Sequence, residues 1–141
     1  MFEMPAGKKM RIEIAQLPPG ELNPNFSRYK HWSYRAEARR IWRTAVFYSV
    51  IDARNRAQLG GTQFPFGKAR LHWTFIYGVK RKRDADNLIA ACKASQDALV
   101  DAGILLSDDT EHLLVEPPVI LVAPERAPLT VIDIEEVVRC R

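Results

Sequence analysis

Residues 69–102, ARLHWTFIYGVKRKRDADNLIAACKASQDALVDA, join a strand pattern to a helix pattern through four cations and two carboxylates. Every second residue of Ala69–Val79 is apolar, which predicts a half-buried strand. In Asp86–Ala102 the apolar residues recur at steps of four and three, and Gly103 follows. This spacing predicts a helix with one packing seam that ends at the glycine. The chain therefore changes from strand to helix within Lys80–Asn87, KRKRDADN.

The strand-to-helix segment has the residue types of a metal and phosphate site. On an extended backbone, Asp84 and Asp86 project from one face and can share an ion. A hard cation such as magnesium, or manganese in its place, is held by one or two carboxylates, with water and phosphate oxygens as its other ligands. Four neighbouring cations would bind the phosphates: Lys80, Arg81, Lys82 and Arg83.

Composition places the chain among globular proteins with an uneven charge. Its 141 residues, 47% of them hydrophobic, fit one domain (1–141) with a substantial core. Residues 1–83 contain 17 Lys or Arg against 5 Asp or Glu, whereas residues 84–141 contain 4 against 12. A basic surface beside an acidic pocket is typical of a metal-dependent enzyme that acts on nucleic acid. Differently charged solvated faces are the alternative.

Two other features narrow the class of protein. The two cysteines, Cys92 and Cys140, have neither metal-ligand spacing nor a disulfide pattern, which favours a reducing compartment. No apolar run reaches the roughly 20 residues of a membrane span, and the first residues lack a signal-peptide pattern. We therefore expect a cytoplasmic protein that does not contact a membrane.

The rest of the chain supplies further strands and a second helix. Alternation predicts strands over residues 10–17, 113–122 and 129–138, the last two as paired neighbours. Residues 34–55 form a predicted helix capped by Ser33. Its expected buried stripe consists of Ala38, Ile41, Trp42, Ala45, Val46 and Ser49. The pattern is that of an α+β single domain with a mixed β-sheet and two main helices.

Cations outside the central segment are candidates for DNA contacts. Arg35, Arg39 and Arg43 fall at i, i+4 and i+8 of the first helix and would form one row along a duplex. Arg28 and Lys30, in the predicted loop before that helix, would also bind phosphates. A solvated helix face is the structural alternative for the row.

A third carboxylate comes from the segment after the second helix. Asp108 and Asp109 follow AGILLS and lie in a predicted turn. Taken singly, Asp109 is explained as a turn former, and Asp86 as a helix cap. Together with Asp84, they would complete a metal site open to phosphate.

Residues 81–113 resemble the RusA family of Holliday junction resolvases. The resemblance lies in RKRDADNL, QDALVDAG and LLSDD, with one extra residue between the glycine and the Asp pair. It implies a RusA-like, homodimeric fold and a bacterial or phage-encoded protein. The implied activity is a magnesium-dependent endodeoxyribonuclease that resolves four-way DNA by paired symmetric nicks in recombination and repair.

The resemblance also assigns roles to individual residues. Asp84, Asp86 and Asp109 are implied to be the catalytic, metal-binding carboxylates, with Asp108 left unassigned beside them. The family has a lysine one turn after the second Asp, where this chain has Ala90. Lys93 shares that face of the helix and would replace the family's lysine.

Two other functions are compatible with the same residues. Ala90 at the lysine position would suit a junction-binding protein with impaired cleavage. A metal site of three carboxylates would equally suit a nuclease with a different DNA substrate.

Overall fold

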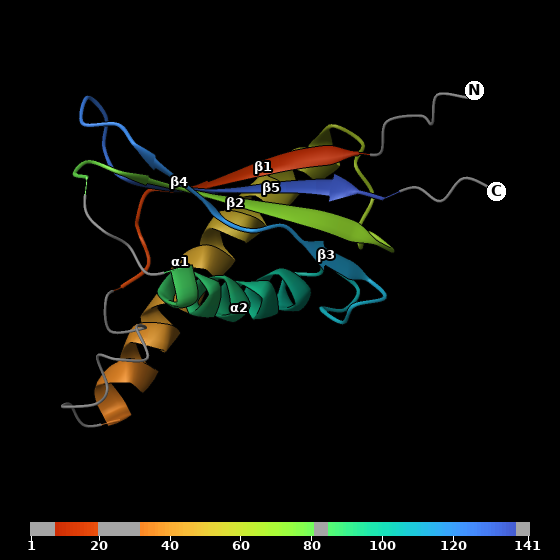
Figure 1. Ribbon diagram of the computed structural model, residues 1–141. Coiled ribbons are helices and arrows are strands. Elements are labelled where there is room, and N and C mark those ends of the chain that lie inside the picture. The colour runs from red at the N-terminus through yellow and green to blue at the C-terminus, as the bar shows by residue number, and fades with distance from the viewer. Residues whose placement is uncertain (1–7, 20–31, 81–84, 138–141) are drawn as a thin grey trace.

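The computed structural model describes residues 8–19, 32–80 and 85–137, without the side chains of Trp32 and residues 85–87. Within these ranges the fold is α+β, with a mixed sheet and two helices, as predicted (Figure 1). In chain order the elements are β1 (Lys9–Ile14), α1 (Trp32–Leu59), β2 (Ala69–Tyr77), α2 (Ala85–Asp101), β3 (Leu113–Val115), β4 (Val119–Val122) and β5 (Leu129–Glu136).

Strand β2 lies at the centre of the sheet. On one side it pairs antiparallel with β5, which pairs antiparallel with β1. On its other side, β3 pairs with the first half of β2 and β4 with the second half, both in parallel. The helix α2 therefore forms the crossover from β2 to its parallel neighbours.

Two predictions about the last strands are wrong. The expected strand 113–122 is divided into β3 and β4 by Pro117 and Pro118, which cannot donate hydrogen bonds to a ladder. β5 does not neighbour β4, because β2 lies between them. The crossover fills one side of β2 with parallel strands, so the antiparallel β5 occupies the other side.

Both helices lie against the same face of the sheet (Figure 1). The alternation predicted for residues 69–79 is confirmed for Leu71, Trp73 and Phe75, which are completely buried, but the strand ends at Tyr77 and Val79 is exposed. Ile132 and Ile134 of β5 lie opposite Trp73 and Leu71 and extend the same apolar layer. Within the described residues no helix covers the opposite face of the sheet, which carries charged side chains and a small apolar cluster of Ile76, Leu129 and Val131.

Helix α1 differs from its prediction at its start and on one flank. It begins at Trp32, so Ser33 lies inside the helix and the predicted cap position is wrong. Trp42, Val46 and Val50 are completely buried, but Ile41 is 48% exposed. Successive residues are about 100° apart on a helix, so α2 covers Trp42 and not Ile41. No helix within the described residues is long and apolar enough to cross a membrane.

The packing seam predicted for α2 is confirmed in full and faces the core. Its buried members are Leu88, Cys92, Ser95, Leu99 and Ala102. Burial raises the pKa of the Cys92 thiol to about 12, so this thiol stays protonated and unreactive near neutral pH. Gly103 ends the helix region with φ of +78°, a conformation that glycine adopts without strain.

A buried hydrogen-bond network joins the two helices. The indole Nε1 of Trp42 donates to Ser95 Oγ at 2.8 Å and to the carbonyl of Ala91 at 3.2 Å. The Ser95 hydroxyl in turn donates to the same carbonyl at 2.8 Å. Every polar group in this contact is therefore satisfied inside the core.

We expect Ser95→Ala to destabilise the protein by about 1 kcal/mol, because Trp42 then keeps only its longer hydrogen bond. Urea unfolding followed by tryptophan fluorescence measures the change. Ser49→Ala is the matched control, since Ser49 Oγ also donates to the carbonyl four residues earlier but accepts nothing from Trp42. Equal losses of stability in the two variants would contradict a special role for the Trp42–Ser95 contact.

Candidate metal and nucleic-acid sites

The start of α2 follows the end of β2 as the sequence predicts. β2 ends at Tyr77, Lys80 is exposed, and α2 begins at Ala85. Arg81, Lys82, Arg83 and Asp84 lie outside the described residues, as does the side chain of Asp86. The order of strand, connection and helix is confirmed. Because α2 already includes Ala85 and Asp86, the extended backbone expected at Asp86 is wrong, and so is Asp86 as the helix cap. The sharing of one metal ion by Asp84 and Asp86 stays a prediction.

Lys93 lies two turns into α2 on the side of Asp86. Seven residues correspond to nearly two full turns, so their backbone positions share one face. Lys93 is exposed, and Ala90 on the same side is half-buried. The position of Lys93 is compatible with a role beside the aspartates, and that role stays a prediction.

Asp109 lies at the other end of α2. It precedes Leu113, which pairs with Ala69 at the beginning of β2, whereas Asp86 follows the end of β2. The 17 residues of α2 extend over about 25 Å. One chain therefore does not bring Asp86 and Asp109 together. Among the described residues, no three His, Cys, Asp or Glu side chains are grouped so that they could hold a metal ion.

The carboxylate of Asp109 is bonded within its own turn. Oδ1 accepts hydrogen bonds from the backbone N–H groups of Glu111 and His112, each at 3.0 Å. The ring Nδ1 of His112 lies 2.6 Å from the same oxygen, and Ser107 Oγ donates to Oδ2 at 3.0 Å. The hydrogen bonds from His112 and Ser107 hold the pKa of Asp109 below its usual value. These contacts fit the turn-forming alternative, and His112 is a partner that the sequence reasoning missed.

The predicted arginine row on α1 is only partly maintained. Arg39 and Arg43 are exposed and line one groove, about 490 Å³ in volume. Arg35 is half-buried outside that groove, and its Nε has no hydrogen-bond partner among the described residues. Arg40, which the i, i+4 spacing leaves off the row, lines the groove as well. The loop cations Arg28 and Lys30 lie outside the described residues.

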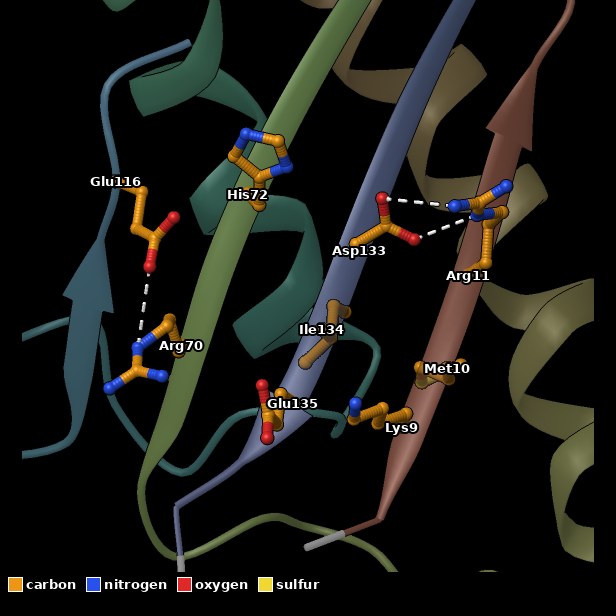
Figure 2. A pocket seen from close by; sticks show the side chains of 9 residues that line it. All are labelled: Lys9, Met10, Arg11, Arg70, His72, Glu116, Asp133, Ile134 and Glu135. Carbon is orange, nitrogen blue, oxygen red and sulfur yellow. Dashed lines mark hydrogen bonds and ion pairs between the residues drawn. The ribbon is translucent and has the colours of Figure 1, made fainter. Parts of the chain in front are cut away.

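A second hollow, of about 550 Å³, lies on the open face of the sheet (Figure 2). Arg11 Nε donates to Asp133 Oδ1 at 2.7 Å, and Arg70 pairs with Glu116 at 3.5 Å. The ionisable lining residues are Lys9, Arg11, Arg70, His72, Glu116, Asp133 and Glu135. Three cations oppose three carboxylates, so the hollow offers no net attraction to a phosphate backbone. The alternation in the sequence indicates that these side chains point away from the core, but only the strand pairing shows that they lie close together.

Comparison with known proteins identifies no family for this chain. No protein-family model matches the sequence, and no curated protein matches it significantly. The resemblance of residues 81–113 to RusA resolvases therefore stays a prediction from those residues.

We expect Asp109→Asn to lower the melting temperature at neutral pH, because a neutral amide accepts these hydrogen bonds less strongly than a carboxylate. The pKa of Asp109 is lowered in the folded state, so its charge stabilises the fold above the ordinary aspartate pKa. That contribution is lost as the pH falls through the lowered pKa. The difference in melting temperature from wild type should therefore shrink below about pH 4.

Asp108→Asn is the control, since Asp108 makes no hydrogen bond within the described ranges. Thermal unfolding followed by circular dichroism compares the two variants across pH. A loss in Asp109→Asn that stays constant into acid, or an equal loss in Asp108→Asn, would contradict the assigned role of the Asp109 carboxylate.

Proposed function

We propose that this chain is a magnesium-dependent endodeoxyribonuclease that resolves Holliday junctions by paired symmetric nicks, acting as a homodimer. The observation that supports it best is the start of α2 at Ala85, between Asp84 and Asp86 and directly after β2 and four cations. Carboxylates for a metal ion and cations for phosphate thus belong to one short connection of the fold.

Each residue of the proposed site has a defined task. Asp84 and Asp86 would hold magnesium or manganese, for which two protein carboxylates suffice. Such an ion, when bound, would lower the pKa of a water and neutralise charge on the scissile phosphate. Lys93 would stabilise negative charge on that phosphate from the same side of α2. Asp109 is the third carboxylate of the motif, although its hydrogen bonds fit its own turn.

DNA binding would extend from this site along cationic side chains. Lys80 lies between β2 and the proposed metal ligands, and Arg39 and Arg43 are exposed on α1. Contacts of this kind release counterions, so the affinity for DNA should fall steeply with salt.

One observation favours a second function, junction binding with impaired cleavage. Asp109 is far from Asp86 within the chain, and Ala90 replaces the lysine of the motif. A protein with only two of the three carboxylates at its site would bind DNA more readily than it cuts.

We expect the wild type to nick a synthetic four-way junction symmetrically in magnesium and to leave linear duplex intact. Asp86→Asn should lower this rate by at least about 100-fold, because it removes a proposed metal ligand. Asp97→Asn, an exposed carboxylate on the same helix, is the matched control and should cleave normally. Gel electrophoresis of end-labelled strands measures the nicks.

Three outcomes of that assay have different meanings. Normal cleavage by Asp86→Asn would refute the metal site, and equal digestion of linear duplex would refute junction specificity. Tight junction binding without nicks would favour the second function.

The edge formed by β3 and β4 supports the proposed homodimer. Within the described residues, β3 and β4 pair only with β2, and their outer side has no strand partner. The exposed large apolar residues of this edge are Leu114, Val115, Val119, Ile120, Leu121 and Val122. An exposed apolar edge strand is a template for pairing with another chain. β4 has no charged residue, so two copies can meet there about a two-fold axis without repulsion.

We expect Leu121→Lys to convert the dimer to a monomer, because a lysine on each edge introduces like charges where the copies meet. Leu59→Lys is the control, since Leu59 is 90% exposed at the end of α1, away from this edge. Sedimentation velocity measures the oligomeric state, and circular dichroism shows whether both variants fold. A monomeric wild type, or a dimer that persists in Leu121→Lys, would contradict the assignment of this interface.

A further inference from the structure

The groove along α1 combines cations with an exposed aromatic ring. Its lining residues recur at helical spacing, and the last residue of α2 closes one side. They are Ala36, Arg39, Arg40, Arg43, Thr44, Phe47, Tyr48 and Asp101. The proposed nuclease function uses two of these arginines as phosphate contacts and gives no role to the ring.

The arginines of this groove are accessible to an anionic ligand. Arg39 forms no ion pair with any described residue. Arg43 pairs with Asp101, and Arg40 Nε donates to Glu37 Oε2 at 3.1 Å. All four of these paired side chains are at least 45% exposed. Exposed ion pairs contribute little to stability, so phosphate oxygens can replace the carboxylates at small cost.

The ring of Tyr48 is positioned for stacking. Tyr48 is 69% exposed, the greatest exposure of any described aromatic residue. The half-buried Phe47 packs against it at a centroid distance of 6.0 Å and an interplanar angle of 75°. Phe47 therefore restrains the Tyr48 ring while leaving most of it in contact with solvent. Aromatic rings beside a cationic groove are the elements with which proteins bind unpaired nucleotides.

We propose that this groove binds single-stranded DNA, with Arg39 and Arg43 on phosphates and Tyr48 stacked on an unpaired base. The choice of DNA rests on the proposed nuclease function, whereas the preference for a single strand follows from the groove itself. In a duplex the bases are already stacked on one another, so Tyr48 has no free base to contact. Phosphate contacts by arginine alone would not distinguish single strands from duplex.

The groove lies apart from the proposed metal site. Asp101 and Asp86 are at opposite ends of α2, separated by about 22 Å of helix. A strand in the groove would therefore lie away from the position of cleavage. In a junction, this strand would be unpaired DNA near the branch point.

Fluorescence anisotropy with labelled single-stranded DNA of about 12 nucleotides tests the proposal on the full chain in chelator, so that no cleavage occurs. Tyr48→Ala should weaken single-strand binding about tenfold, whereas Tyr48→Phe, which keeps the ring, should bind as the wild type does. Tyr34→Ala is the matched control, since Tyr34 is also on α1 and 59% exposed but does not line the groove. Duplex binding should be the same in all four proteins.

Other results would overturn the groove assignment. These are unchanged single-strand binding in Tyr48→Ala, equal weakening for single strand and duplex, or an equal loss in Tyr34→Ala. Tighter binding of RNA of the same sequence would overturn the choice of DNA.

The nicking assay on wild-type protein separates this proposal from the nuclease function. Tyr48-dependent binding without nicking would leave the groove intact and refute the nuclease. Junction cleavage without any dependence of single-strand binding on Tyr48 would refute the groove alone.

Discussion

The hydrogen bonds from the buried Trp42 indole to Ser95 and to the carbonyl of Ala91 join the two helices inside the core. A buried N–H without a partner costs free energy, so sliding α1 along α2 would lose these bonds as well as apolar contacts. Both helices share the apolar layer of β2 and β5. The chain connection from β2 positions the start of α2, whereas the crossing of the helices brings Asp101 beside Arg43. The α1 groove therefore depends on this crossing.

Features determined by local spacing could be predicted from the sequence. The alternation in β2 and the seam of α2 were both correct, because each follows from the geometry of one element. The exposure of Ile41 could not be predicted from spacing, because the width of the buried stripe depends on which neighbour covers the helix. The order of the strands is likewise non-local. Nothing in the sequence of β5 shows that it pairs with β2 and not with β4.

The same distinction between local and non-local features applies to the candidate site. The order of β2 and α2 was predicted from consecutive residues and is confirmed, with α2 beginning one residue before the predicted Asp86. Asp109 and Asp86 lie at opposite ends of a rigid helix of 17 residues, so one chain does not bring them together, and the spacing of a motif does not reveal this separation. The ring of His112 near Asp109 follows from the three-residue spacing of a turn and could have been anticipated. The α1 groove could not, because it needs Asp101 from another helix to close it.

Manganese binding measured by electron paramagnetic resonance tests the central claim, that the start of α2 holds a divalent metal ion, most directly. We expect one manganese site in the wild type that is lost in the double variant Asp84→Asn/Asp86→Asn and retained in Asp97→Asn. Manganese binding that is unchanged in the double variant, or absent from the wild type, would contradict it.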